Sequence, residues 1–74
     1  MKRHYVQSSA LQSVGYDPDR KILELEFRDN GSVWQYFKIP ASVYNKFIHA
    51  DSLGSFFVTR IKGRYPEEKV EYAR

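Results

Sequence analysis

The chain has 74 residues, no cysteine and only two histidines, His4 and His49. This length holds one small hydrophobic core and excludes a nucleotide-binding α/β unit or a catalytic barrel, while the lack of cysteine excludes disulfides and thiolate metal sites. The formal net charge of +3 at pH 7 permits an anionic partner without requiring one. We expect a single domain over residues 1–74, with no metal and no cofactor, in the cytoplasm, because no apolar run could span a membrane and no signal peptide is recognisable.

Three segments with alternating apolar and polar residues predict three antiparallel strands. Residues 10–16 form the first and end at Asp17-Pro18-Asp19-Arg20, whose residue types favour a turn. Residues 23–28 alternate leucine or phenylalanine with charged residues, which is the pattern of a half-buried strand. Asn30-Gly31 then gives a strong hairpin signal and leads into an aromatic strand over residues 33–37.

The turn at Asn30-Gly31 decides which side chains share a face of this sheet. A two-residue type I′ turn places Phe27 opposite Trp34 and Leu25 opposite Tyr36, on the side of the predicted helices, whereas a one-residue slip would reverse the two faces. With a four-residue loop at 17–20, the helix-side face also holds Val14, Tyr16 and Leu23. The opposite, open face then carries Leu11, Ile22, Glu24, Glu26, Val33, Gln35 and Phe37.

Helical spacing replaces the alternation after Ile39-Pro40. Apolar residues four apart predict a short helix over residues 41–49 and a second helix from about 53 to 62, with Gly63 as its C-terminal stop. The charged tail, residues 66–74, is predicted to be frayed or loosely helical. The sequence thus predicts an α+β fold, in which a three-stranded antiparallel β-meander is followed by two short helices packed on one face.

A set of residues spread over about positions 6–65 follows the pattern of a known family: Ser8-Ser9, Gly15-Tyr16-Asp17, Leu23, Phe27, Gly31, Tyr36, Ile39-Pro40, Tyr44, Ala50, Ser52-x-Gly54, Phe56-Phe57, Ile61 and Tyr65. In these residues and their order the sequence resembles the KTSC domain. This family is named for its occurrence at the C-terminus of some lysyl-tRNA synthetases and is also found as small bacterial and phage proteins.

This resemblance implies a domain without catalytic activity, for which RNA binding has been suggested because of the synthetase context. One position departs from the family pattern, since Trp34-x-Tyr36 stands where the family has Tyr-x-Tyr. The residues themselves favour the same expectation. None of the serines lies in a G-x-S-x-G motif, and His49 would need both a nucleophile and an orienting acid to be brought to it by the fold. Glu24 and Glu26 share a strand face that is expected to be solvated, and His49 and Asp51 are expected to mark a helix end and the start of the next helix.

A basic cluster at the end of the second predicted helix is the first candidate ligand-binding site. It consists of Arg60, Lys62 and Arg64, and no acidic residue lies between Ser52 and Tyr65. A continuous helix would place Arg60 and Arg64 on one face, where two guanidinium groups can bind phosphate, and Tyr65 beside them could stack on a base. The same cations also suit the C-terminus of a helix, so the cluster alone leaves both interpretations open.

Two further places could contact a ligand. Ser52 and Gly54 lie at a helix N-terminus, where free N–H groups can approach an anion, or where they serve only as an N-cap and a close packing contact. Trp34 and Tyr36 could stack on bases from an open sheet, but the predicted register buries them beneath the helices.

Apolar residues on the open face of the sheet suggest a partner, and a homo-oligomer formed through them would stabilise so small a domain. The predicted interface residues are Leu11, Ile22, Val33 and Phe37.

Three functions are consistent with these features. The first is a non-catalytic binding domain for nucleotide-type ligands, most simply RNA, that uses the basic helix end and its neighbouring aromatic residues. The second is an oligomeric capture protein for a nucleotide metabolite or cyclic nucleotide signal, of the kind a phage could use as a sponge. The third is a protein-interaction module that acts through the open sheet face.

Overall fold

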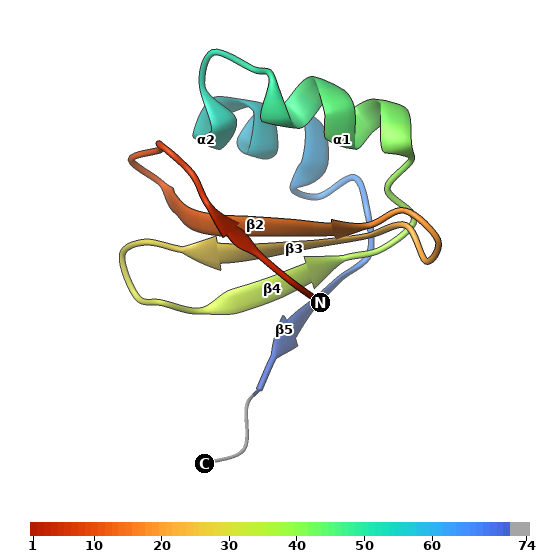
Figure 1. The fold of residues 1–74 in the computed structure, drawn as a ribbon, viewed down its shortest axis with the longest axis horizontal. Coiled ribbons are helices and arrows are strands. Elements are labelled where there is room, and N and C mark those ends of the chain that lie inside the picture. Colours follow the sequence, from red (N-terminus) through yellow and green to blue (C-terminus); the bar gives the residue numbers. More distant parts are fainter. Residues whose placement is uncertain (72–74) are drawn as a thin grey trace.

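A computed structural model describes residues 1–71 of the chain. Five antiparallel strands form one sheet in the order β1-β2-β3-β4-β5, and the helices lie on one of its faces (Figure 1). In chain order the elements are β1 (His4–Tyr5), β2 (Leu11–Asp17), β3 (Ile22–Phe27), β4 (Val33–Tyr36), α1 (Ala41–Ile48), α2 (Leu53–Phe56), the π-helical turn η1 (Phe57–Ile61) and β5 (Glu67–Val70).

The predicted α+β class and the helices on one face are confirmed, but the prediction of three strands is wrong. β1 and β5 add one strand to each edge of the predicted meander. β5 lies in the segment expected to be frayed or helical and pairs with β4, with Val33 opposite Val70 and Tyr36 opposite Glu67. The last residues of the predicted tail, 72–74, lie outside the described residues.

The β3–β4 hairpin has a longer loop than the two-residue turn predicted at Asn30-Gly31. The Phe27 N–H donates to the Ser32 carbonyl, and the N–H of Gly31, which has a φ of +70°, donates to the Phe27 carbonyl. Leu25 therefore lies opposite Trp34, two residues away from the predicted partner. Because side chains alternate with a period of two, this even shift keeps every β4 side chain on the predicted face.

The loop between β2 and β3 has four residues, as predicted, but it comprises residues 18–21 and not 17–20. Val14 therefore lies opposite Leu25, and Tyr16 lies opposite Leu23. Both side chains face the helices as expected. The pairing of β2 with β3 is irregular between Leu11 and Ser13, and this irregularity turns the side chain of Leu11 to the other face of the sheet. Leu11 is completely buried in the helix-side core, so its predicted place on the open face is wrong.

The core fills the space between the sheet and the helices. Aromatic rings contact one another through it: Tyr16 stacks on Tyr44 at 4.4 Å between centroids, and Phe47 lies 5.9 Å from Phe56. Such ring pairs supply much of the buried apolar area in a domain of this size. The buried apolar residues of this cluster are Leu11, Val14, Leu23, Leu25, Tyr36, Ile39, Phe47, Phe57 and Ile61.

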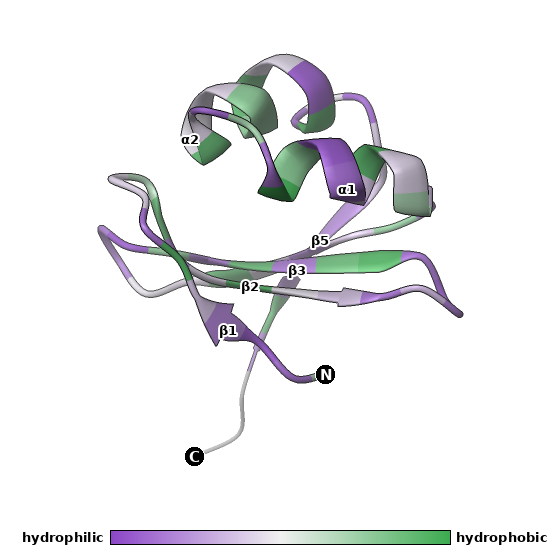
Figure 2. Cartoon of the chain, turned by 45° about the horizontal axis from the view of Figure 1, so that its top comes forward, coloured by the Kyte–Doolittle hydropathy of each residue, from purple (hydrophilic) through white to green (hydrophobic). Residues whose placement is uncertain are grey.

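The N-terminal segment covers part of the face predicted to be open. Figure 2 shows this hydrophilic segment passing the sheet on the side away from the helices. Arg3 donates to Ser13 at 2.9 Å and forms an ion pair with Glu24, which also accepts a hydrogen bond from Gln35 at 2.8 Å. Only 4% of Glu24 is exposed, so this carboxylate is part of a buried polar network and not of a solvated face.

Two of the predicted interface residues are covered within a single chain. Ile22 is 9% exposed and Val33 is 5% exposed, and Phe37 is half-buried. Leu11 lies in the core, so within residues 1–71 three of the four predicted interface residues offer little exposed apolar surface to a partner.

The second helix begins where predicted and ends one residue earlier. The Ser52 hydroxyl accepts from the N–H of Ser55, which caps α2. The Lys62 N–H donates to the Phe57 carbonyl, a bond that closes the wider π-type turn of η1. Gly63 follows with a φ of +79°, in agreement with its predicted role as a stop. Among the described residues, no helix combines the length and the apolar character needed to cross a membrane.

Candidate ligand-binding site

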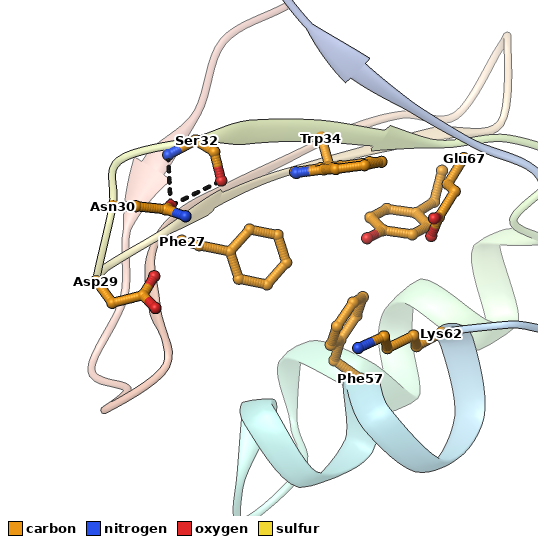
Figure 3. Close-up of a pocket in the computed structure, with 9 residues that line it drawn as sticks. Phe27, Asp29, Asn30, Ser32, Trp34, Phe57, Lys62 and Glu67 are labelled. Atoms are coloured by element: carbon orange, nitrogen blue, oxygen red, sulfur yellow. Dashed lines mark hydrogen bonds between the residues drawn. The ribbon is translucent and has the colours of Figure 1, made fainter.

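An open pocket of about 420 Å³ lies between the end of the β3–β4 hairpin and η1 (Figure 3). Its base is aromatic and its rim is polar. The residues that line it are Phe27, Asp29, Asn30, Ser32, Trp34, Tyr36, Phe57, Lys62 and Glu67.

Strand alternation and the helical turn bring four rings together in the pocket. Trp34 and Tyr36 point to the helix side of β4, Phe27 ends β3, and Phe57 begins η1. The Phe57 ring meets Tyr36 at 5.3 Å and Phe27 at 5.4 Å, both edge to face. Tyr36 and Phe57 are buried, whereas Trp34 and Phe27 are half-buried. Trp34 and Phe27 therefore supply the accessible aromatic surface.

Trp34 remains accessible because of its position in the sheet. Its neighbour on one side is the buried Leu25, and on the other side it pairs with Lys69 of the edge strand β5, which is exposed. Part of the indole therefore faces the pocket, in contrast to Tyr36, which is only 3% exposed.

The polar rim of the pocket has two ends: one lies at the β3–β4 loop, and the other lies where η1 is followed by β5. At the loop end, the Asn30 side-chain oxygen accepts from both the backbone N–H of Ser32, at 3.0 Å, and its hydroxyl, at 2.8 Å. These two bonds fix the loop and the orientation of the Asn30 amide (Figure 3). Lys62 and Glu67 line the other end of the pocket.

The Tyr36 hydroxyl stays protonated throughout the physiological range. Burial raises the pKa of Tyr36 well above its ordinary value of 10, and the negative charge of Glu67 raises this pKa further. Tyr36 is thus a neutral group in the wall of the pocket near pH 7.

The predicted basic cluster does not form one site. Only Lys62 lines the aromatic pocket. Arg60 lies over the Phe56 ring, with 5.9 Å between the guanidinium carbon and the ring centroid. The helical turn ends at Ile61, so Arg60 and Arg64 do not lie on one continuous helix. Tyr65 is partly buried and packs against the hydrophobic core.

Ser52 and Gly54 belong to a separate pocket of about 420 Å³, which they line together with Ser9, Ala10 and other residues. The Ser52 oxygen is already used as the helix cap. A Cβ placed on Gly54 would lie 3.0 Å from the Cβ of Ala10, so the glycine permits close packing of α2 on the segment before β2. The structure supports the cap-and-packing interpretation for both residues.

Several pocket residues were missed by sequence reasoning. Asp29, Asn30 and Ser32 lie in the hairpin loop, where Asn30-Gly31 was taken only as a turn signal. Glu67 lies in the strand that was expected to be a tail. Phe27 lies on the predicted helix-side face and Phe57 within the second predicted helix, and nothing in their spacing indicates that they line a pocket. Among residues 1–71, no three histidine, aspartate or glutamate side chains are grouped so that they could hold a metal ion.

The chain is similar in sequence to bacterial proteins of comparable length and to a part of some lysine–tRNA ligases. It is 47% identical over 57 residues to a protein of Stutzerimonas stutzeri, covering 77% of this chain and 79% of that protein. It is 36% identical over 64 residues to a lysine–tRNA ligase of Nostoc sp., but the match spans only 11% of the ligase against 86% of this chain.

A solved structure has the same fold along nearly the whole chain. The crystal structure of a KTSC domain protein from Yersinia pestis matches with a TM-score of 0.89 and 40% identity, covering 95% of this chain and 97% of that one. The KTSC domain model itself matches residues 7–65. The chain therefore belongs to the KTSC domain family.

Proposed function

We propose that this chain is a non-catalytic RNA-binding domain that takes an unpaired base into its aromatic pocket. The observation that carries the proposal is the accessible ring surface of Trp34 and Phe27 in a pocket that also contains Lys62. Stacking of a base on an aromatic side chain contributes about 1–3 kcal/mol and tolerates any base. A positive side chain beside the rings matches the phosphate that follows the base.

The size of the pocket supports a contact with one nucleotide, and cations outside the pocket support contacts with its neighbouring phosphates. Its volume of about 420 Å³ lies within the usual range for small-ligand sites, about 300–1,000 Å³. Beyond the pocket, the exposed side chains of Lys69, Arg60 and Arg64 are available to neighbouring phosphates. The related lysine–tRNA ligases act on tRNA by name, which favours RNA as the source of the base.

The proposal can be tested with the fluorescence of Trp34, the only tryptophan in the chain. We expect short single-stranded RNA to quench this emission, and the affinity to fall with salt with a slope of about −0.7 per phosphate contacted. Lys62→Glu is expected to weaken binding strongly, whereas Lys46→Glu, which makes the same charge change on α1 outside the pocket, is expected to have little effect. An unquenched Trp34, or equal losses in the two variants, would contradict the proposal.

Capture of a free nucleotide is a second candidate that the pocket volume favours, because the pocket holds about one nucleotide. The two candidates differ in the chain-length dependence of binding. If RNA is the ligand, a hexanucleotide binds more tightly than the mononucleotide, since additional phosphates contact the exposed cations. If a free nucleotide is the ligand, the mononucleotide binds at least as tightly.

A further inference from the structure

We propose that the pocket selects guanine, with the Asp29 carboxylate accepting from the N–H groups of the base and the Asn30 amide donating to its carbonyl oxygen. This inference rests on the proposed function, because it assigns the base that enters the same pocket. The loop end of the pocket carries the two residues side by side in the sequence, and both line the pocket. Figure 3 shows them at the end of the pocket farthest from Glu67.

The hydrogen bonds of Asn30 determine which of its atoms remains for a ligand. Its side-chain oxygen accepts two bonds from Ser32, so the oxygen is held toward that residue. The amide nitrogen is then the end that points away from Ser32, and Figure 3 shows it on the side of Phe27. An amide fixed in this way offers a donor, and no acceptor, to a group in the pocket.

Asp29 offers the complementary chemistry. It is exposed on the loop, and its carboxylate forms no hydrogen bond or ion pair with another residue of the part of the chain that the structure describes. A carboxylate accepts two parallel N–H bonds, the geometry in which charge-assisted hydrogen bonds are strongest. Glu67 is placed differently, since it lies opposite the buried Tyr36 in the sheet at the other end of the pocket.

Among the common bases, guanine matches this pair of residues most fully. Its Watson–Crick edge presents one carbonyl oxygen followed by two neighbouring N–H donors, which fit one amide donor and one carboxylate. Adenine and cytosine each present a single amino group beside an acceptor nitrogen, and uracil presents one N–H between two carbonyls. Each of these leaves one carboxylate oxygen unpaired or opposite a lone pair, an unfavourable contact.

The two ends of the pocket also fit the two ends of a nucleotide. With the Watson–Crick edge at Asp29 and the ring against Trp34 and Phe27, the sugar and phosphate extend toward Lys62. The Asp29 carboxylate is thus placed at the end where a guanine nucleotide donates hydrogen bonds, and the Lys62 ammonium group, beside Glu67, at the end where the nucleotide is anionic.

The test compares guanosine monophosphate with inosine monophosphate, which differ only in the amino group beside the ring N–H. Both are titrated against the full chain, with Trp34 quenching as the readout, in the wild type, in Asp29→Asn and in Glu68→Gln. Glu68 makes a matched control because it lies opposite Gln35 on β5 and does not line the pocket. We expect the guanine ligand to bind about tenfold more tightly in the wild type and in Glu68→Gln, and the preference to shrink to about twofold or less in Asp29→Asn.

The possible outcomes separate this inference from the proposed function. Binding of the guanine, inosine, adenine and uracil nucleotides with equal affinity would overturn guanine selection and leave base binding intact. Failure of every nucleotide and of a guanine-containing hexanucleotide to quench Trp34 would overturn both. Retention of the guanine preference in Asp29→Asn, with the fold checked by circular dichroism, would overturn the role of Asp29. A preference that Asp29→Asn removes supports the inference, and comparison of hexanucleotide with mononucleotide then shows whether the guanine comes from RNA or from a free nucleotide.

Discussion

Gly15 shows how a single residue can determine the course of the N-terminal segment. It is buried in β2, and a Cβ built on it would lie 2.6 Å from the backbone oxygen of Lys2 and 3.1 Å from Cγ of Arg3. No real Cβ tolerates the first of these distances, and the obstacle is backbone. Glycine at this position therefore allows residues 2 and 3 to lie against the sheet and lets Arg3 reach Glu24.

We predict that Gly15→Ala displaces this segment and lowers the free energy of unfolding by about 1–3 kcal/mol. Urea denaturation of the full chain measures this loss. The same substitution in a chain that begins with the initiating methionine followed by His4 should have little effect, because the colliding backbone is no longer there. An equal loss in both chains would show that Gly15 is required for another reason.

Some individual residues of the aromatic pocket could be predicted from the sequence, and others could not. The sequence predicts Trp34 as core and offers stacking as the alternative, and its intermediate burial is compatible with both. Leu11 was placed on the wrong face because an irregularity between Leu11 and Ser13 changes the alternation of the strand, and such bulges leave no clear trace in hydrophobic periodicity. Asp29 and Asn30 were not identified, because turn residues are chosen for backbone geometry as well as for chemistry.

Among the elements, β5 connects the edge of the sheet to the pocket. Its Glu67 lines the pocket and its Lys69 lies beside Trp34. The Phe37 N–H donates to the Pro66 carbonyl, so this carbonyl points toward β4. By alternation the backbone N–H and carbonyl of Glu68 also point toward β4, whereas the N–H groups of Glu67 and Lys69 point away from the sheet.

This geometry supplies a matched pair of proline substitutions. We predict that Glu68→Pro removes a β4–β5 hydrogen bond, detaches β5 and shifts the emission of Trp34 to longer wavelength as the indole becomes hydrated. Lys69→Pro should shift the emission less, because its N–H is not used in the sheet. Equal shifts in the two variants would mean that β5 is not held by this hydrogen-bond pattern.

The two edge strands are also the elements that sequence reasoning could not recover. The central strands and the helical segments contain several apolar residues each, and their spacing gives clear periods of two and of about four. β1 has two exposed residues, and β5 contributes only Val70 as an apolar side chain. Their pairing depends on backbone hydrogen bonds with a neighbouring strand, which hydropathy does not reveal.

At the scale of the whole molecule, the tyrosines make the stability of the fold sensitive to alkaline pH. Burial raises the pKa of Tyr36 and of Tyr44 above 10, and burial together with the charge of Asp17 raises the pKa of Tyr16. Above pH 10 the unfolded chain therefore releases phenolic protons that the folded chain retains. Because the unfolded state then binds fewer protons, the free energy of unfolding decreases as the pH rises.

We predict that this free energy changes little between pH 7 and 9 as far as the tyrosines are concerned, and falls above pH 10. The buried Tyr36 alone adds up to about 1.4 kcal/mol per pH unit to the slope. Urea denaturation at successive pH values should therefore give a shallower fall for Tyr36→Phe than for the wild type. Tyr5→Phe is the control, because Tyr5 is 79% exposed, and its curve should have the wild-type slope.

The path of the N-terminal segment has a consequence for any larger protein that contains this domain. Met1 lies on the side of the sheet away from the helices (Figure 1). The aromatic pocket is lined by Phe57 of η1 and by Lys62, on the helix side. A module joined ahead of Met1 would emerge behind the sheet and leave the pocket unobstructed. Such a linker would be attached two residues before Arg3, which is paired with Glu24. Tension between modules would therefore act on this buried polar network before it reached the aromatic pocket.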